Sequence, residues 1–192
     1  MKRLLITVAS IAALTLIGDA ALADATAKEC AKAANLFRDA GESGTFFGKS
    51  YGYAVYPTIG KAGFVVGGAY GTGCVFVHNK QVGTSKMTQA SFGWLAGAQG
   101  YTLIVFFEDE RAYKEFSSGT FEFGAGVNAV AITAAASAST STGGSTATAS
   151  GGKKDAATAG GFQKGLAPFS IVKGGLMYEA ALNGAKFSFK KL

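Results

Sequence analysis

Histidine, cysteine and proline are scarce in this chain, and their scarcity excludes several kinds of catalytic site. The 192 residues include one histidine, two cysteines and two prolines. A catalytic zinc centre needs several histidine, cysteine or carboxylate ligands, and the sequence has no spaced cluster of them. The only histidine, His78, follows Cys74 by four residues but lies beside Asn79-Lys80, a pair that predicts a hairpin turn. The sequence therefore favours a protein without catalytic residues, metal or cofactor.

Two short motifs resemble functional sites but lack the context that those sites need. Residues 124–129 have the G-x-G-x-x-A spacing of a dinucleotide loop, yet no amphipathic helix follows them. The acidic run Glu108-Asp109-Glu110 is explained more simply as the start of a helix than as a cation site. Neither motif supports an enzyme, so we expect a binding or structural protein.

The N-terminus has the features of a cleavable secretory signal peptide. Met1-Lys2-Arg3 gives a positive start, residues 4–17 form an apolar run, and Ala21-Leu22-Ala23 supplies the small residues that a signal peptidase needs. The run is shorter than the roughly 20 apolar residues of a spanning helix. We expect a signal peptide at 1–23 and one mature domain at 24–192. Its location would be the periplasm or outer-membrane face of a Gram-negative bacterium, or the medium.

The charge balance is modestly basic. The formal net charge is +6, with 18 lysine and arginine residues against 12 acidic residues. Such an excess favours anionic partners, of which phospholipid head groups are one kind. Nucleic acid is a weaker candidate, because tyrosines such as Tyr51, Tyr53 and Tyr56 in an alternating pattern are typical of a strand.

Cys30 and Cys74 are the only cysteines in the chain. In the oxidising compartment that a signal peptide implies, we expect them to form a disulfide. Closing the long loop between them would stabilise the fold by about 4 kcal/mol on the chain-entropy model. Two buried thiols that pack as small apolar residues are the alternative, because the sequence does not show how far apart they lie.

Two helices are predicted from capping residues and hydrophobic periodicity. The first begins at the capping box of Thr26 and Glu29 and is expected to end at Gly41. The second is a short helix at 110–118 that Asp109 caps.

The rest of the chain is predicted to form glycine-rich strands. A strand at 53–56 is expected to stop at Pro57, and residues 186–190 alternate between polar and phenylalanine side chains as a closing strand does. Glycines along the strands permit sharp coiling. We therefore expect an α+β fold with a strongly coiled, antiparallel, barrel-like sheet. Residues 134–161 are almost entirely Ala, Ser, Thr and Gly, which predicts a low-complexity loop within the domain.

Three glycine-containing stretches carry a family resemblance. The first is YAVYPTIGKAGFVVGGAYGTG at 53–73; the others are Ser91-Phe92-Gly93 with Gly97 and Gln99, and Lys164-Gly165-Leu166 with Glu179. Their combination resembles the SYLF family, a lipid-binding domain found beside SH3 domains in a yeast actin-patch regulator and alone in exported bacterial proteins. The resemblance implies a noncatalytic protein that binds phospholipid or a membrane surface, without the cytoskeletal partners.

Five residues are candidates for lipid contact. Lys61, Lys86 and Lys164 could place positive charge on phosphate, and Phe46 and Phe47 could enter the acyl boundary. The alternatives are a turn lysine at 61, a hairpin end at 86 and core packing for the two phenylalanines. A second function class also stays open, in which the domain is a structural envelope protein or binds an envelope protein partner without specific lipid binding.

Overall fold

The computed structural model describes residues 24–63, 66–92, 98–124, 128–132, 161–173, 180–182 and 184–192. The predicted signal peptide at 1–23 lies outside these residues, as does the predicted loop at 134–161 apart from Gly161.

The N-terminal helix α1 (Ala27–Asp39) begins at the predicted capping box. The backbone N–H of Glu29 donates to Thr26 Oγ1 at 3.3 Å, and the backbone N–H of Thr26 donates to Glu29 Oε2 at 2.9 Å. The helix ends at Asp39 with Ala40 as its C-cap, immediately before Gly41, so the predicted end of the helix at this glycine is confirmed. Gly41 also begins a second short helix, α2 (Gly41–Gly44), which leads into the 3₁₀ turn η1 (Thr45–Gly48).

One coiled sheet contains all nine described strands, in the order β5-β9-β3-β2-β1-β4-β7-β6-β8. Their neighbouring pairs are antiparallel except β6 with β7, which run parallel. The predicted α+β fold with a coiled, mainly antiparallel sheet is therefore confirmed. The strands are β1 (Gly52–Gly63), β2 (Val66–Val77), β3 (Lys80–Phe92), β4 (Ala98–Phe107), β5 (Phe121–Glu122), β6 (Asn128–Ile132), β7 (Leu166–Lys173), β8 (Ala180–Ala181) and β9 (Lys186–Lys191).

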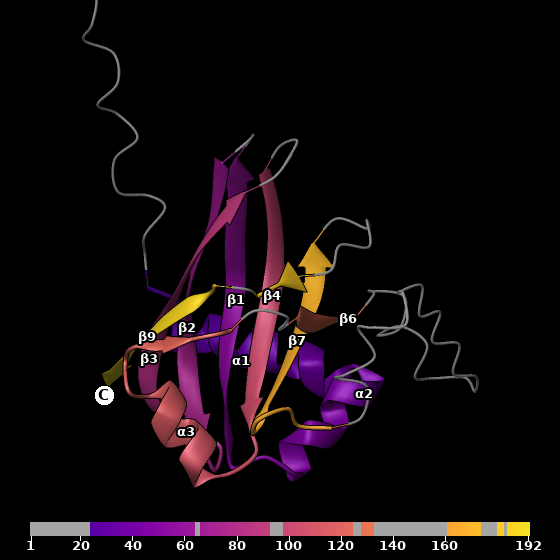
Figure 1. Cartoon of the computed structure of the whole chain (residues 1–192). Helices are drawn as coiled ribbons and strands as arrows, with labels where there is room; N and C mark the ends of the chain where they lie inside the picture. The colour runs from indigo at the N-terminus through magenta and orange to yellow at the C-terminus, as the bar shows by residue number, and fades with distance from the viewer. Residues whose placement is uncertain are drawn as a thin grey trace, which may run out of the picture.

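Helices cover both faces of this sheet. Figure 1 shows α1 and α2 on one side of the long strands, and the short helix α3 (Glu110–Phe116) at their lower end. We call the face under α1 the outer face and the face against α3 the inner face. Asp109 caps α3 as predicted, because the Ala112 N–H donates to Asp109 Oδ1 at 2.7 Å.

Each face has its own hydrophobic core. On the outer face Val55, Ile104 and Phe106 pack against Cys30 and Phe37 of α1. On the inner face the largest buried side chains are Tyr56, Ile59, Leu103, Phe107 and Phe187, which pack with Phe116 of α3. Burial on both faces explains why residues 103–107 of the central strand β4 are apolar throughout rather than alternating.

Strand β1 does not stop at Pro57, as the sequence predicted, but continues to Gly63. Its register shifts between Val55 and Thr58 against β2 and between Tyr56 and Ile59 against β4, so Pro57 lies in a bulge. A proline has no N–H to donate, and a bulge is one of the few places in a sheet that tolerates it. The bulge also reverses the alternation, because Tyr56 and Ile59 both contribute to the inner core.

Candidate functional site

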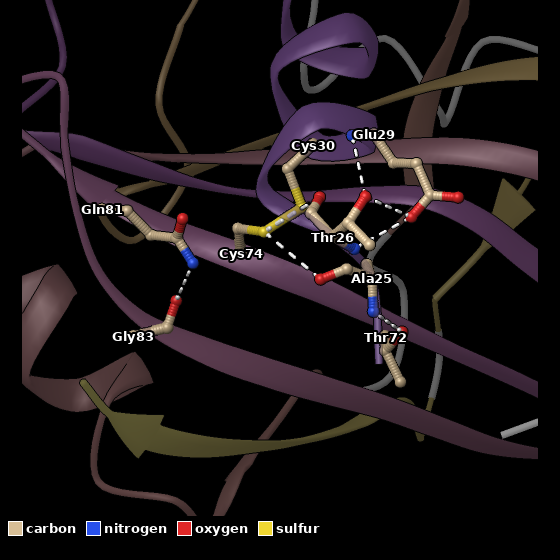
Figure 2. The surroundings of a disulfide bond; sticks show 8 residues. All are labelled: Ala25, Thr26, Glu29, Cys30, Thr72, Cys74, Gln81 and Gly83. Atoms are coloured by element: carbon tan, nitrogen blue, oxygen red, sulfur yellow. Dashed lines mark hydrogen bonds between the residues drawn. A yellow bond between two sulfur atoms is a disulfide. The ribbon is translucent and has the colours of Figure 1, made fainter. Parts of the chain in front are cut away.

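The disulfide between Cys30 and Cys74 fastens α1 to strand β2, with a Cα–Cα distance of 6.0 Å. This confirms the predicted pairing and rules out the alternative of two free thiols. Figure 2 shows a second attachment beside it, in which the Ala25 N–H donates to Thr72 Oγ1 at 2.7 Å. Because Cys74 is oxidised, it cannot serve as a thiolate nucleophile. His78 lies with Asn79 in the two-residue turn between β2 and β3, where both have positive φ.

Phe46 and Phe47 belong to η1 and pack on the outer core. Phe46 is 3% exposed, and its ring centroid lies 4.9 Å from that of Phe169. Phe47 is half-buried, with its centroid 4.9 Å from that of Phe106 and the Arg38 guanidinium carbon 4.2 Å from its own centroid. Both rings therefore pack on the outer core, as the alternative of core packing describes, Phe46 fully and Phe47 in part. Their contact with lipid stays a prediction.

The three predicted lysines do not come together. Lys61 is 8% exposed and pairs in register with Ala69 of the inner core, so it lies on the inner face. Lys164 is exposed in the turn before β7, where the neighbouring Gly165 packs against Arg111 at the start of α3. Lys86 is exposed on the outer face of β3. Lys86 alone of the three lies among other surface lysines that a sheet register places beside it.

Those other lysines come from β9, the C-terminal strand. In the register of β3 with β9, Lys86 is opposite Ser188, Thr88 is opposite Lys186, and Thr84 is opposite Lys190. Side chains two residues apart on one strand point to the same face, and diagonal neighbours on adjacent strands are about 7–8 Å apart. Lys186 and Lys190 therefore flank Lys86 on both sides. We call Lys86, Lys186 and Lys190 the outer basic patch.

Two carboxylates partly balance this patch. Asp24 Oδ1 lies 3.3 Å from Lys86 Nζ, and Glu122 Oε2 lies 3.6 Å from Lys186 Nζ. All four side chains are about half or more exposed, so each ion pair is solvated and contributes little to stability. Exposed pairs of this kind exchange readily for another anion, which keeps the three ammonium groups available to a ligand.

The sequence motifs that resemble catalytic sites have structural explanations. Asp109 is the cap of α3, and the glycine pattern at 124–129 leads into strand β6 rather than into a helix. In the part of the chain that the structure describes, no three His, Cys, Asp or Glu side chains gather as metal ligands would. Within the same residues, no helix is long and apolar enough to cross a bilayer.

A family model described as "Ysc84: Las17-binding protein actin regulator" matches residues 88–191, more than half of the chain. The chain belongs to the Ysc84 (SYLF) family. This confirms the family that the sequence motifs indicated, and it is a family of binding domains rather than of enzymes. No curated protein matches the chain significantly.

The Ysc84 match includes β9 with Lys186 and Lys190 but only the end of β3, and Lys86 lies two residues before the match begins. It also includes the motifs at 91–99 and 164–166, whereas the motif at 53–73 precedes it. Sequence reasoning did not identify Lys186 and Lys190 as site residues. The alternation of residues 186–190 was a signal that both lysines share one face. It could not show that this face adjoins Lys86.

Proposed function

We propose that this Ysc84-family protein is an exported, noncatalytic protein that binds anionic phospholipid at a membrane surface of the bacterial cell envelope. The observation that carries the proposal is the outer basic patch, in which adjacent strands hold three lysines on one exposed face. Each lysine near an anionic membrane surface contributes about 1 kcal/mol of attraction. Three together would favour anionic over neutral vesicles by about 3 kcal/mol, a factor of roughly 150.

Export is supported by the disulfide and by the N-terminal sequence. Disulfides persist in the periplasm and outside the cell but are rare in the cytosol. Cys30 and Cys74 form one here, and residues 1–23 have the positive start, apolar run and small residues of a leader. The printed family description names Las17 binding and actin regulation. We carry over the binding role and not those partners, because an exported bacterial protein would not meet actin.

Vesicle flotation tests the proposal. The purified protein, expressed with its own leader, is mixed with phosphatidylcholine vesicles that contain or lack phosphatidylglycerol, at low and high salt. We expect binding to the anionic vesicles only, and weaker binding at high salt, because exposed charges are screened beyond about 10 Å at 0.1 M ionic strength.

Matched charge reversals locate the contact. Lys86→Glu and Lys186→Glu each replace a positive by a negative charge within the outer basic patch. Lys164→Glu makes the same change in net charge at an exposed turn before β7. We expect the first two variants to bind several-fold more weakly and Lys164→Glu to bind as the wild type does. Equal losses in all three would mean diffuse attraction by net charge. No binding by the folded wild type would reject the lipid function and favour an envelope protein partner.

A further inference from the structure

A groove of about 480 Å³ crosses the outer face of four neighbouring strands, β2, β3, β9 and β5. Its volume lies within the range of sites that hold small molecules. Gly119 and Thr120 of the turn before β5 also line the groove, as does Phe187. The polar side chains on which its chemistry depends are Tyr70, Lys86, Thr88, Glu122, Lys186 and Ser188.

The sheet register arranges these groups in two rows. Tyr70 is opposite Thr88, Thr88 is opposite Lys186, and Lys186 is opposite Glu122. In the next row Lys86 is opposite Ser188. The two lysines therefore occupy one diagonal of a four-residue square on β3 and β9, and two hydroxyl residues, Thr88 and Ser188, occupy the other diagonal.

This square suits a phosphate ester. Two flexible ammonium groups about 7–8 Å apart at their Cβ atoms can both reach one phosphate placed between them. The hydroxyls of Thr88 and Ser188 can donate to the phosphate or accept from a ligand hydroxyl, and the Glu122 carboxylate can only accept. Glu122 is already paired with Lys186, and a bare anion would use the two hydroxyls only as donors and leave their acceptor capacity unused. A phosphate whose substituent carries hydroxyl groups would use this capacity.

We infer that this groove binds a phosphate ester that bears hydroxyl groups, the chemistry of a glycerol- or sugar-based head group, with Lys86 and Lys186 on the phosphate. The inference rests on the proposed lipid-binding function and assigns it a site and a preference. Thr88 and Ser188 supply the preference, because they distinguish a hydroxylated head group from another of equal charge.

Asp24 acts at this site as an internal competitor. Its carboxylate lies 3.3 Å from Lys86 Nζ, where a ligand phosphate would bind. The chain is held there by the hydrogen bond from the Ala25 N–H to Thr72 Oγ1 and by the disulfide at Cys30. A ligand must displace this carboxylate from Lys86. Removing the negative charge should therefore strengthen binding rather than weaken it.

Lipids of equal charge test the preference. Phosphatidylglycerol has hydroxyls on its head group, whereas phosphatidylethanol has the same charge and none. One net hydrogen bond is worth about 1 kcal/mol, or about fivefold in affinity. We expect the wild type to bind phosphatidylglycerol vesicles about fivefold more tightly, and Thr88→Val/Ser188→Ala to lose this preference while binding phosphatidylethanol as before. Asp24→Asn should bind both lipids more tightly, and Lys164→Gln should bind as the wild type does.

Competition by soluble glycerol 3-phosphate distinguishes binding in the groove from general attraction to a membrane surface. It should release the wild-type protein from phosphatidylglycerol vesicles at concentrations where sodium sulfate of equal ionic strength does not. Thermal melting checks that each variant is folded. If the wild type binds the two lipids equally and glycerol 3-phosphate does not selectively release it, the inferred ligand site in the groove is wrong. The proposed lipid-binding function would still stand. If calorimetry detects binding of glycerol 3-phosphate but the protein binds no vesicles, the ligand site in the groove is supported and the proposed function is wrong. If the protein binds neither vesicles nor glycerol 3-phosphate, both the ligand site and the proposed function are wrong.

Discussion

Reduction of the disulfide should destabilise the protein by about 4 kcal/mol. Cys30 and Cys74 are 44 residues apart in sequence. The chain-entropy relation for a loop of that length gives an entropy loss in the unfolded state of about 13 cal/mol/K, or about 4 kcal/mol at 25 °C. For a domain of this size, 1 kcal/mol shifts the melting temperature by about 2–4 °C. The expected fall is therefore roughly 8–16 °C.

The assay compares oxidised and reduced wild-type protein by circular dichroism during heating, with thiol titration to verify each state. The same sequence in both states avoids the cavity or buried hydroxyl that a substitution of these fully buried cysteines would create. Cys30→Ala/Cys74→Ala is the control, because its melting temperature should not respond to reductant. A shift below about 2 °C on reduction would refute the loop-entropy reasoning, since the crosslink would then restrict the unfolded chain far less than the relation requires.

Two further predictions concern the outer core and the start of α1. Phe46→Ala should destabilise the fold by about 3–5 kcal/mol, because the ring is buried against Phe106, Phe162 and Phe169; chemical denaturation would measure the loss, and unchanged stability would show that Phe46 is not part of the core. Hydrogen bonds from the Thr26 backbone and hydroxyl lower the pKa of Glu29. The ionised Glu29 carboxylate therefore contributes fully to the stability of the fold above the usual glutamate pKa, and this contribution is lost as pH falls through the lowered folded-state pKa. Glu29→Gln should remove this part of the acid sensitivity, as measured by melting temperatures across pH 2–6; an identical pH profile in the variant would contradict it.

Local sequence signals predicted the elements whose interactions are local. The capping box of Thr26 and Glu29 and the Asp109 cap each involve residues three positions apart, so the sequence contains both partners side by side. The alternation at 186–190 likewise predicted strand β9. Gly41 likewise marked the end of α1, but the local sequence did not show that it also starts α2.

The face on which Lys61 lies could not be predicted, because the bulge at Pro57 reverses it. Simple alternation from Tyr53 would place Lys61 on the outer face with Tyr53 and Val55. The extra residue in the bulge turns Ile59 and Lys61 inward instead. Whether a proline ends a strand or sits in a bulge depends on the neighbouring strands, which the local sequence does not specify.

The outer basic patch escaped prediction for a different reason. It is formed by pairing β3 with β9, about 100 residues later in the chain, across a sheet whose order is not sequential. No local pattern states which strand will lie beside Lys86. The sequence left core packing and lipid contact both open for Phe46 and Phe47, because only the packing of η1 on the outer core shows that Phe46 is buried and Phe47 half-buried.

Strand β9 is the last in the chain but pairs with β3, so the sheet can be assembled fully only after the whole chain is present. On the proposed export route, a chain that crosses a membrane from its N-terminus delivers α1, β1 and β2 first, so the crosslink between residues 30 and 74 can form before the last strand has crossed. Strand β9 then completes the pairing of β3. Until β9 arrives, Lys86 lacks both of its flanking lysines. The outer basic patch, and the binding proposed for it, would therefore depend on completed translocation.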